Sequence, residues 1–110
     1  MARVVAFIPD LLFGSNVQAA LTAAGHEVEL VGRLEPGVRA DVLVVDLTFD
    51  APDRVEQTQA VSAPGVRTLA FYSHVEADVR ALAEQAGFDL VVPRSRMARE
   101  GAALVDRLSA

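Results

Sequence analysis

The sequence predicts an α/β protein with three layers, in which helices cover both sides of a five-stranded parallel sheet with the strand order 2-1-3-4-5. The first observation is residues 42–45, four consecutive aliphatic side chains that are typical of a strand buried on both faces. The second is that apolar segments alternate along the chain with segments of helical periodicity. Because crossovers between parallel strands are right-handed, this alternation favours a doubly wound sheet with that strand order.

Local patterns predict each strand and helix in turn. Pro9 and Pro93 close strands because proline cannot donate to a sheet, and Gly25 and Gly87 stand where helices end. Residues 27–30 alternate between acidic and apolar side chains, as in a strand at the edge of a sheet. Strands are expected at residues 3–8, 26–31, 42–45, 66–72 and 88–92, and helices at residues 12–24, 52–62, 75–86 and 97–108.

Three of these helices have apolar side chains at helical spacing, and these are expected to face the sheet. Asp50 with Pro52, and Ser73 with Glu76 in the capping-box spacing, are the expected starts of the middle two helices. The expected buried residues are Leu12, Phe13, Val17, Ala20, Leu21 and Ala24 in the first helix, Val75, Val79, Leu82 and Ala86 in the third, and Met97, Gly101, Leu104, Val105 and Leu108 in the last.

The connection between the second and third strands is short. Residues 32–40 contain Glu35-Pro36-Gly37, which predicts a turn. A parallel crossover normally needs a dozen residues or more. The helix that would usually cross over at this point is therefore expected to be reduced to a turn.

Composition limits the classes of function. With 110 residues the chain is expected to form one domain over residues 1–110. Its formal charge of −5 and its scattered arginines disfavour binding to nucleic acid. The absence of cysteine and lysine excludes disulfides, thiolate nucleophiles and Schiff-base chemistry. Because no segment has the pattern of a membrane span or a signal peptide, we expect a cytoplasmic protein without a membrane partner.

Four segments of the chain resemble the receiver domain of bacterial response regulators, the signalling domain of two-component systems. They are V-L-V-V-D-L at residues 42–47, A-F-Y-S-H at 70–74, A-G-H-E-V at 24–28 and E-Q-A-G-F-D-L-V-V at 84–92. The resemblance covers nearly the whole chain and implies the flavodoxin-like fold of that family. It also implies that Asp46, at the end of the third strand, accepts a phosphoryl group, and that Ser73, after the fourth strand, senses it.

The sequence departs from the family at the positions that make this switch work. The family has two adjacent acids after the first strand that hold Mg²⁺, whereas only Asp10, one residue later, is acidic here. Asp10 and Asp46 would make a poor magnesium site, because Mg²⁺ requires near-octahedral oxygen ligands. The family's lysine after the fifth strand is absent, and Arg94 stands at its position. We therefore expect a degenerate receiver, or pseudo-receiver, without a cofactor.

Each of these residues also has a structural interpretation. Asp46 is either a phosphoacceptor or ligand-binding carboxylate, or it caps the next loop or pairs with an arginine. A pair with Arg94 would freeze the switch, and the alternative for Arg94 is a solvated loop residue. Ser73 is either the sensor or the cap of its helix, and Asp10 is either a metal ligand or an acid in the first turn of a helix. Gly14-Ser15-Asn16 could cradle a phosphate with backbone N–H groups.

The expected function is that of a stand-alone, atypical receiver-like signalling domain that acts through protein–protein contacts, with a kinase or an output protein as its partner. The alternative is a flavodoxin-like domain that binds a nucleotide or another anionic small molecule at the carboxyl ends of the strands, near Arg94 or Arg96. Whether the domain forms a homodimer stays open. An enzyme is not expected, because no nucleophile, base and orienting group can be assembled from these positions.

Overall fold

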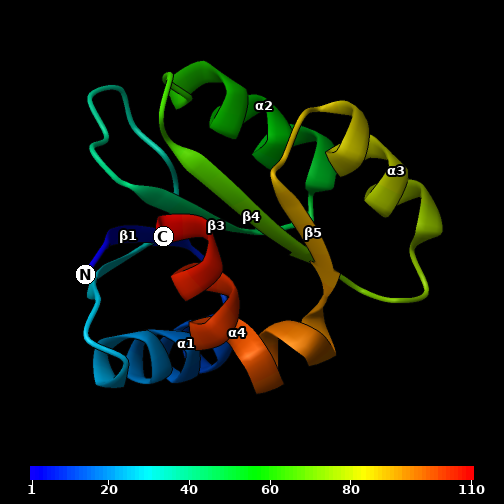
Figure 1. The fold of residues 1–110 in the computed structure, drawn as a ribbon. Helices are drawn as coiled ribbons and strands as arrows, with labels where there is room; N and C mark the ends of the chain where they lie inside the picture. Colours follow the sequence, from blue (N-terminus) through cyan, green and yellow to red (C-terminus); the bar gives the residue numbers. More distant parts are fainter.

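A single five-stranded parallel sheet lies between two pairs of helices in the computed structural model, which describes residues 1–110 (Figure 1). The strand order is β2-β1-β3-β4-β5, so the predicted fold class is confirmed. The strands are β1 (Arg3–Phe7), β2 (Glu27–Val31), β3 (Val42–Asp46), β4 (Arg67–Tyr72) and β5 (Leu90–Pro93). The helices are α1 (Leu11–Ala23), α2 (Ala51–Val61), α3 (Ala77–Gln85) and α4 (Arg94–Ser109).

The core has two halves, one on each side of the sheet, because successive side chains of a strand point to opposite faces. Helices α1 and α4 cover one face of the sheet, and α2 and α3 cover the other (Figure 1). On β3, Val42 and Val44 point to the first face, and Leu43 and Val45 point to the second. All four of these β3 side chains are at most 1% exposed. The aliphatic run therefore does form the inner strand of the sheet, as predicted.

Two helices end at glycine where the sequence indicates it. Gly25 and Gly87 have φ angles of 95° and 89°, a left-handed conformation that glycine adopts without strain. At the second of these ends, the Phe88 N–H donates back to the Ala83 carbonyl oxygen. Phe88 therefore belongs to the end of α3, and β5 begins two residues later than predicted. Pro93 is the last residue of β5, where an edge strand tolerates proline.

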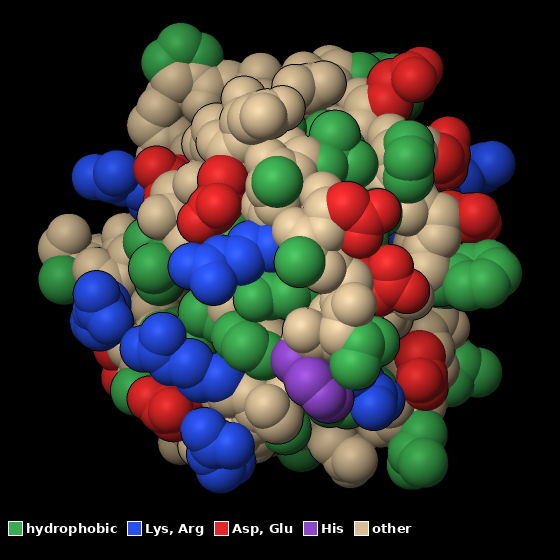
Figure 2. Space-filling view, turned by 90° about the vertical axis from the view of Figure 1, so that its right-hand side faces the viewer, with side chains coloured by type: hydrophobic (Ala, Val, Ile, Leu, Met, Phe, Trp, Pro, Cys, Tyr) green, Lys and Arg blue, Asp and Glu red, His purple; other side chains and the backbone are tan.

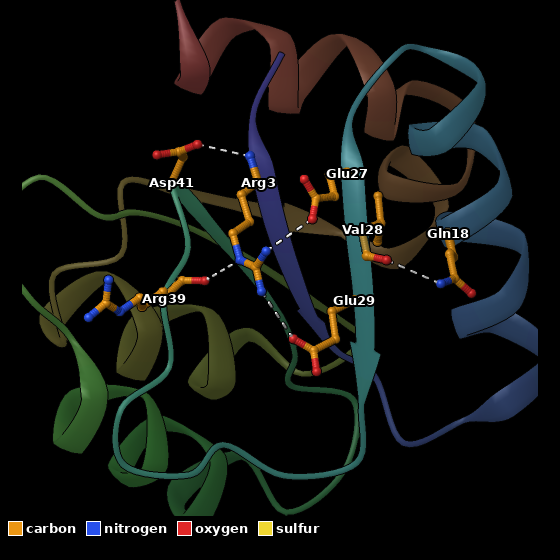
Figure 3. Close-up of polar contacts among 7 residues, drawn as sticks. All are labelled: Arg3, Gln18, Glu27, Val28, Glu29, Arg39 and Asp41. Atoms are coloured by element: carbon orange, nitrogen blue, oxygen red, sulfur yellow. Dashed lines mark hydrogen bonds and ion pairs between the residues drawn. The ribbon is translucent and has the colours of Figure 1, made fainter.

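The connection between β2 and β3 contains no helix, as expected, and it leaves part of one sheet face uncovered by helix. Arg3 of β1 lies on this face with Glu27 and Glu29 of β2 (Figure 3). Its Nη1 is 3.0 Å from Glu27 Oε1, and its Nε donates to the Arg39 carbonyl oxygen at 2.9 Å. The Arg3 N–H donates to the carboxylate of Asp41 at 2.8 Å. Arg3 therefore ties the connection to the sheet and neutralises the acids of the edge strand.

The buried stripe of α1 is narrower than predicted. Val17 and Leu21 are buried and Phe13 is half-buried, but Leu12, Ala20 and Ala24, expected on the same face, are exposed. The helix also buries Gly14, where an added Cβ would lie 2.9 Å from a Leu30 methyl group. Because α1 packs against β2 at Gly14, the side with Gly14, Val17 and Leu21 faces the sheet and the remaining sides face solvent. In the last helix, by contrast, the expected face is confirmed, with Met97, Gly101, Leu104 and Val105 buried and Leu108 half-buried.

The expected starts of α2 and α3 need correction. Helix α2 starts after Asp50 as predicted, but Asp50 has φ 49° and its side chain makes no capping hydrogen bond. Helix α3 starts only after Glu76, because the Ser73 carbonyl oxygen accepts the Glu76 N–H in a turn. Ser73 is therefore not the cap of α3. Val75 lies in that turn and is exposed, and the buried residue of α3 is Ala83. None of the helices is long and apolar enough to cross a membrane.

Candidate functional site at the carboxyl ends of the strands

The segments that follow β1, β3, β4 and β5 meet at one edge of the sheet, because parallel strands end on the same side. Together they line a cavity of about 530 Å³ that is open to solvent. Figure 2 views the molecule from the side to which β4 and β5 point in Figure 1, and both basic and acidic side chains are exposed on this face. The residues that line the cavity are Asp10, Phe13, Thr48, Ser73, His74, Arg94, Ser95 and Ala98. Asp10, Ser73 and Arg94 are thus brought together, as the resemblance implies.

Asp46, the expected phosphoacceptor, does not line this cavity. Its side chain is 4% exposed, and one carboxylate oxygen, Oδ1, accepts hydrogen bonds from both the N–H (2.8 Å) and the hydroxyl of Thr48. A carboxylate that binds the backbone two residues ahead forms an Asx turn. Asp46 therefore shapes the loop after β3, as the structural interpretation of this residue supposed.

Arg54 of α2 takes the other oxygen of Asp46. Its Nη1 is 3.5 Å from Asp46 Oδ2 and also donates to the Asp46 carbonyl oxygen at 2.9 Å. The Arg54 side chain is only 11% exposed, and its guanidinium lies 5.7 Å from the centre of the Phe7 ring. A buried carboxylate requires a partner of opposite charge, and here the chain itself supplies it.

Arg94 does not pair with Asp46, so the pair considered from the sequence is wrong. Arg94 Nη2 lies 3.6 Å from Asp10 Oδ2, and the guanidinium stacks on the Phe13 ring at 4.1 Å. The Phe13 ring in turn packs on Phe71 with centroids 5.1 Å apart. This aromatic contact holds the arginine at the side of the cavity, and the nearer Arg54 occupies the position beside Asp46.

Asp10 has two structural roles. Its Oδ1 accepts the Phe13 N–H at 3.1 Å and so caps α1, as an acid at the start of a helix would. Its other oxygen faces Arg94. The suggested phosphate cradle at Gly14-Ser15-Asn16 is also wrong, because these residues lie inside α1 and the Gly14 N–H donates to the Asp10 carbonyl oxygen.

The donors at this edge do not fit the Mg²⁺ ion that the receiver resemblance implies. Mg²⁺ needs several free oxygen ligands in near-octahedral geometry. The oxygens of Asp46 face Thr48 and Arg54, and those of Asp10 face Phe13 N–H and Arg94. No group of three or more histidine, aspartate or glutamate side chains is arranged to hold a metal ion.

Thr48 and Arg54, the two residues that surround Asp46, were not predicted from the sequence. A signal for Arg54 was present in α2: the inward-facing residues are Ala51, Arg54, Val55 and Thr58, which is helical spacing. Counting the arginine among the inward positions would have completed the stripe. It would also have placed a cation opposite the acid at the end of β3.

Comparison with known proteins gives matches only at the level of structure. No protein-family model and no curated protein matches the sequence. The non-phosphorylated HemR receiver domain from Leptospira biflexa superimposes with a TM-score of 0.80 at 17% identity, over 100% of this chain and 95% of that chain. A response regulator receiver protein from Burkholderia phymatum gives a TM-score of 0.82 at 17% identity, over 99% and 95% of the two chains.

An orphan response regulator of H. pylori also superimposes, with a TM-score of 0.78 at 16% identity, over 98% of this chain and 96% of that chain. These matches agree with the observed fold, a parallel sheet in the order β2-β1-β3-β4-β5 with helices on both faces. The chain has the flavodoxin-like fold of response-regulator receiver domains.

Proposed function

We propose that this protein is an atypical receiver-like signalling domain that acts through protein–protein contacts and is not phosphorylated through a magnesium site. The observation that carries the proposal is the enclosure of Asp46 between Thr48 and Arg54. In this proposal residues 1–110 act as one domain and have no enzymatic activity. The partner is a protein, such as a kinase or an output protein, in the cytoplasm.

The enclosure of Asp46 opposes phosphoryl transfer in two ways. An attacking carboxylate oxygen must reach the phosphorus in line with the leaving group, but the Asp46 side chain is almost fully buried. Transfer also requires a divalent cation that bridges the phosphoryl oxygens, and the cation beside Asp46 is the side chain of Arg54. If Arg54 turned to bind an incoming phosphate, the buried carboxylate of Asp46 would lose its cation.

The test is treatment with a small-molecule phosphodonor and Mg²⁺, followed by intact-mass measurement. We expect no mass gain for the wild-type chain. A stoichiometric gain that is abolished by Asp46→Asn and kept by Asp10→Asn would overturn the proposal and make Asp46 an active phosphoacceptor. An unrelated receiver domain that is known to react serves as the positive control for the donor.

A second candidate function is the binding of an anionic small molecule, such as a nucleotide, in the carboxyl-end cavity. It is favoured by the donors that line this cavity, Ser73, His74, Arg94 and Ser95. Ligand binding to the folded state raises the melting temperature, and the rise grows with the logarithm of the ligand concentration once the site is saturated. In a thermal-shift screen of nucleotides, stabilisation that is lost in Arg94→Ala and kept in Arg107→Ala would favour this function over the first.

A further inference from the structure

Helix α1 is a surface helix without a charged side chain, although 23% of the residues in the whole chain are charged. Leu11 and Leu12 in its first turn are 76% and 77% exposed. A solvent-facing helix normally carries charged residues on its outer side. The remaining exposed residues of α1 are small or neutral, namely Ser15, Asn16, Ala19, Ala20, Thr22 and Ala23. An exposed face of this composition is typical of a contact surface.

A groove of about 220 Å³ lies between α1 and α4. Its buried lining includes Val17, Leu21 and Met97, and the exposed Ala20 and Ala98 are at its sides. Apolar cavities of about 150 Å³ hold a benzene molecule, so this groove has room for one phenylalanine or leucine side chain of a partner. Small alanines at the sides would allow another helix to approach closely.

The charges beside the groove are positive in a protein that is otherwise acidic. Helix α4 has four of the ten arginines but only two of the fifteen acids, which gives it a net charge of +2 while the whole chain has −5. Arg96 and Arg99 share one carboxylate, Glu100, at 3.6 and 3.7 Å. Arg99 also lines the groove and is largely exposed. One positive charge at this rim is therefore available to a partner's carboxylate.

We propose that the groove between α1 and α4 binds an amphipathic helix of a partner protein, with a phenylalanine or leucine between the two helices and an acidic residue against Arg99. An amphipathic helix in an apolar groove is a common mode of recognition. The inference rests on the proposed function, in which this domain acts through protein contacts. It adds the surface that makes the contact and the chemistry of the partner.

A second copy of this chain fits the groove less well than an acidic helix does. A two-fold contact between α1 helices would place an uncharged helix against an uncharged helix and bring no carboxylate to Arg99. The groove also adjoins the carboxyl-end cavity, because Phe13 and Ala98 line both. A helix bound here would therefore lie next to Asp10 and Arg94.

The test is selection of binders to the full chain from a displayed library of helical peptides with random surface residues. We expect enrichment of peptides with phenylalanine or leucine at helical spacing (i, i+3, i+4 or i+7) on one face. These peptides should also have Asp or Glu beside that apolar face. Fluorescence anisotropy then measures the affinity of an enriched peptide. Ala20→Glu and Arg99→Glu should each weaken binding about tenfold or more, the loss of one well-buried contact.

Two matched variants control for charge alone. Ala103→Glu and Arg107→Glu make the same changes at exposed positions of α4 that do not line the groove. Both variants should bind the peptide with an affinity within about twofold of wild type. Measurement in salt screens the long-range effect of the altered charge. Circular dichroism and thermal unfolding of all four variants separate a lost contact from a lost fold.

Three outcomes would overturn the inference: no enriched peptide, enriched peptides without acidic residues, or binding that Ala20→Glu and Arg99→Glu leave intact. A wild-type dimer in sedimentation equilibrium that Ala20→Glu dissociates would assign the groove to a second copy instead. None of these measurements involves Asp46. Phosphoryl labelling of Asp46 would overturn the proposed function and leave the groove result unchanged, so the two failures can be told apart.

Discussion

The two ends of the sheet use polar side chains in different ways. At the amino end, His26 and Asp89 accept backbone N–H groups of Ala2 and Thr68, which hold the starts of β1 and β4. At the carboxyl end, the buried ion pair of Asp46 and Arg54 lies behind a polar cavity. Of the five large apolar side chains that are exposed, Met1 lies at the amino end, and the other four lie at the carboxyl end: Leu11, Leu12, Phe49 and Val75.

This difference indicates which end is available for function. The amino end uses its acceptors to fix strand starts, so its polar groups have local, structural partners. The carboxyl end also satisfies its charges internally, and each end has a pocket of similar volume, about 530 Å³ at the carboxyl end and 540 Å³ at the amino end. The carboxyl end differs in the apolar side chains that it leaves exposed. In open α/β sheets ligands and partners gather at the carboxyl ends of strands. The predictions below test how far the two ends differ in energy.

The largest effect is expected from Arg54→Ala at the carboxyl end. The substitution leaves the Asp46 carboxylate buried without its cation, which should lower the free energy of unfolding by about 3 kcal/mol. Urea denaturation measures this change. Adding Asp46→Asn to Arg54→Ala should recover part of the loss, because the uncompensated charge is then gone. A loss of less than about 1 kcal/mol in the single variant would mean that water reaches the pair.

A smaller effect is expected from His26→Leu at the amino end. The nearly buried imidazole accepts the Ala2 N–H at Nδ1, so Nε2 carries the proton and donates to Asp106 at 2.6 Å. Removing the ring leaves the Ala2 N–H without a partner and should cost about 2 kcal/mol. Asp106→Ala should cost less, because Asp106 is exposed. Nitrogen-15 NMR that places the proton on Nδ1 would contradict this arrangement.

The capping role of Asp10 predicts a loss of about 1 kcal/mol for Asp10→Ala, measured by thermal or urea unfolding. Asp10→Asn keeps an oxygen for the Phe13 N–H and removes the charge that faces Arg94. Because both partners of that ion pair are about half exposed, we expect Asp10→Asn to be close to wild type. Equal losses in the two variants would assign the effect to the ion pair.

The smallest effect is expected at the surface of the amino end. Glu29→Gln removes a 3.9 Å ion pair with Arg3 in which both side chains are well exposed. The change in unfolding free energy should stay within about 0.5 kcal/mol and vanish in high salt. If Glu29→Gln costs as much as Asp10→Ala, the cluster around Arg3 stabilises the sheet face more than its exposure suggests.

The sequence was sufficient for the fold because the decisive patterns are local and strong. The aliphatic run of β3 has no polar side, and the helices α1 and α3 end at glycines with positive φ. The absence of a helix between β2 and β3 follows from the length of that segment alone. Each of these features depends on consecutive residues, which a single sequence displays directly.

The site was predictable only in part, since its contacts join residues on different elements. Strand direction predicts a site at the carboxyl ends of the strands, and Asp10, Ser73 and Arg94 line one cavity there. The choice of Arg54 over Arg94 as the partner of Asp46 depends on side-chain reach across the core, which spacing does not encode. The outer side of α1 was equally hidden, because a helix without charged residues shows no polar face from which to read its orientation.

The placement of Arg54 has a consequence for how such a domain could be controlled. A magnesium ion or a phosphoryl group can come and go with the metabolic state of the cell, but a guanidinium on the same polypeptide is always present at the same stoichiometry. Under the proposed function, a domain built in this way receives no chemical input at its aspartate. Its influence on a partner would then be set by how many copies are made and by how many partners compete for them.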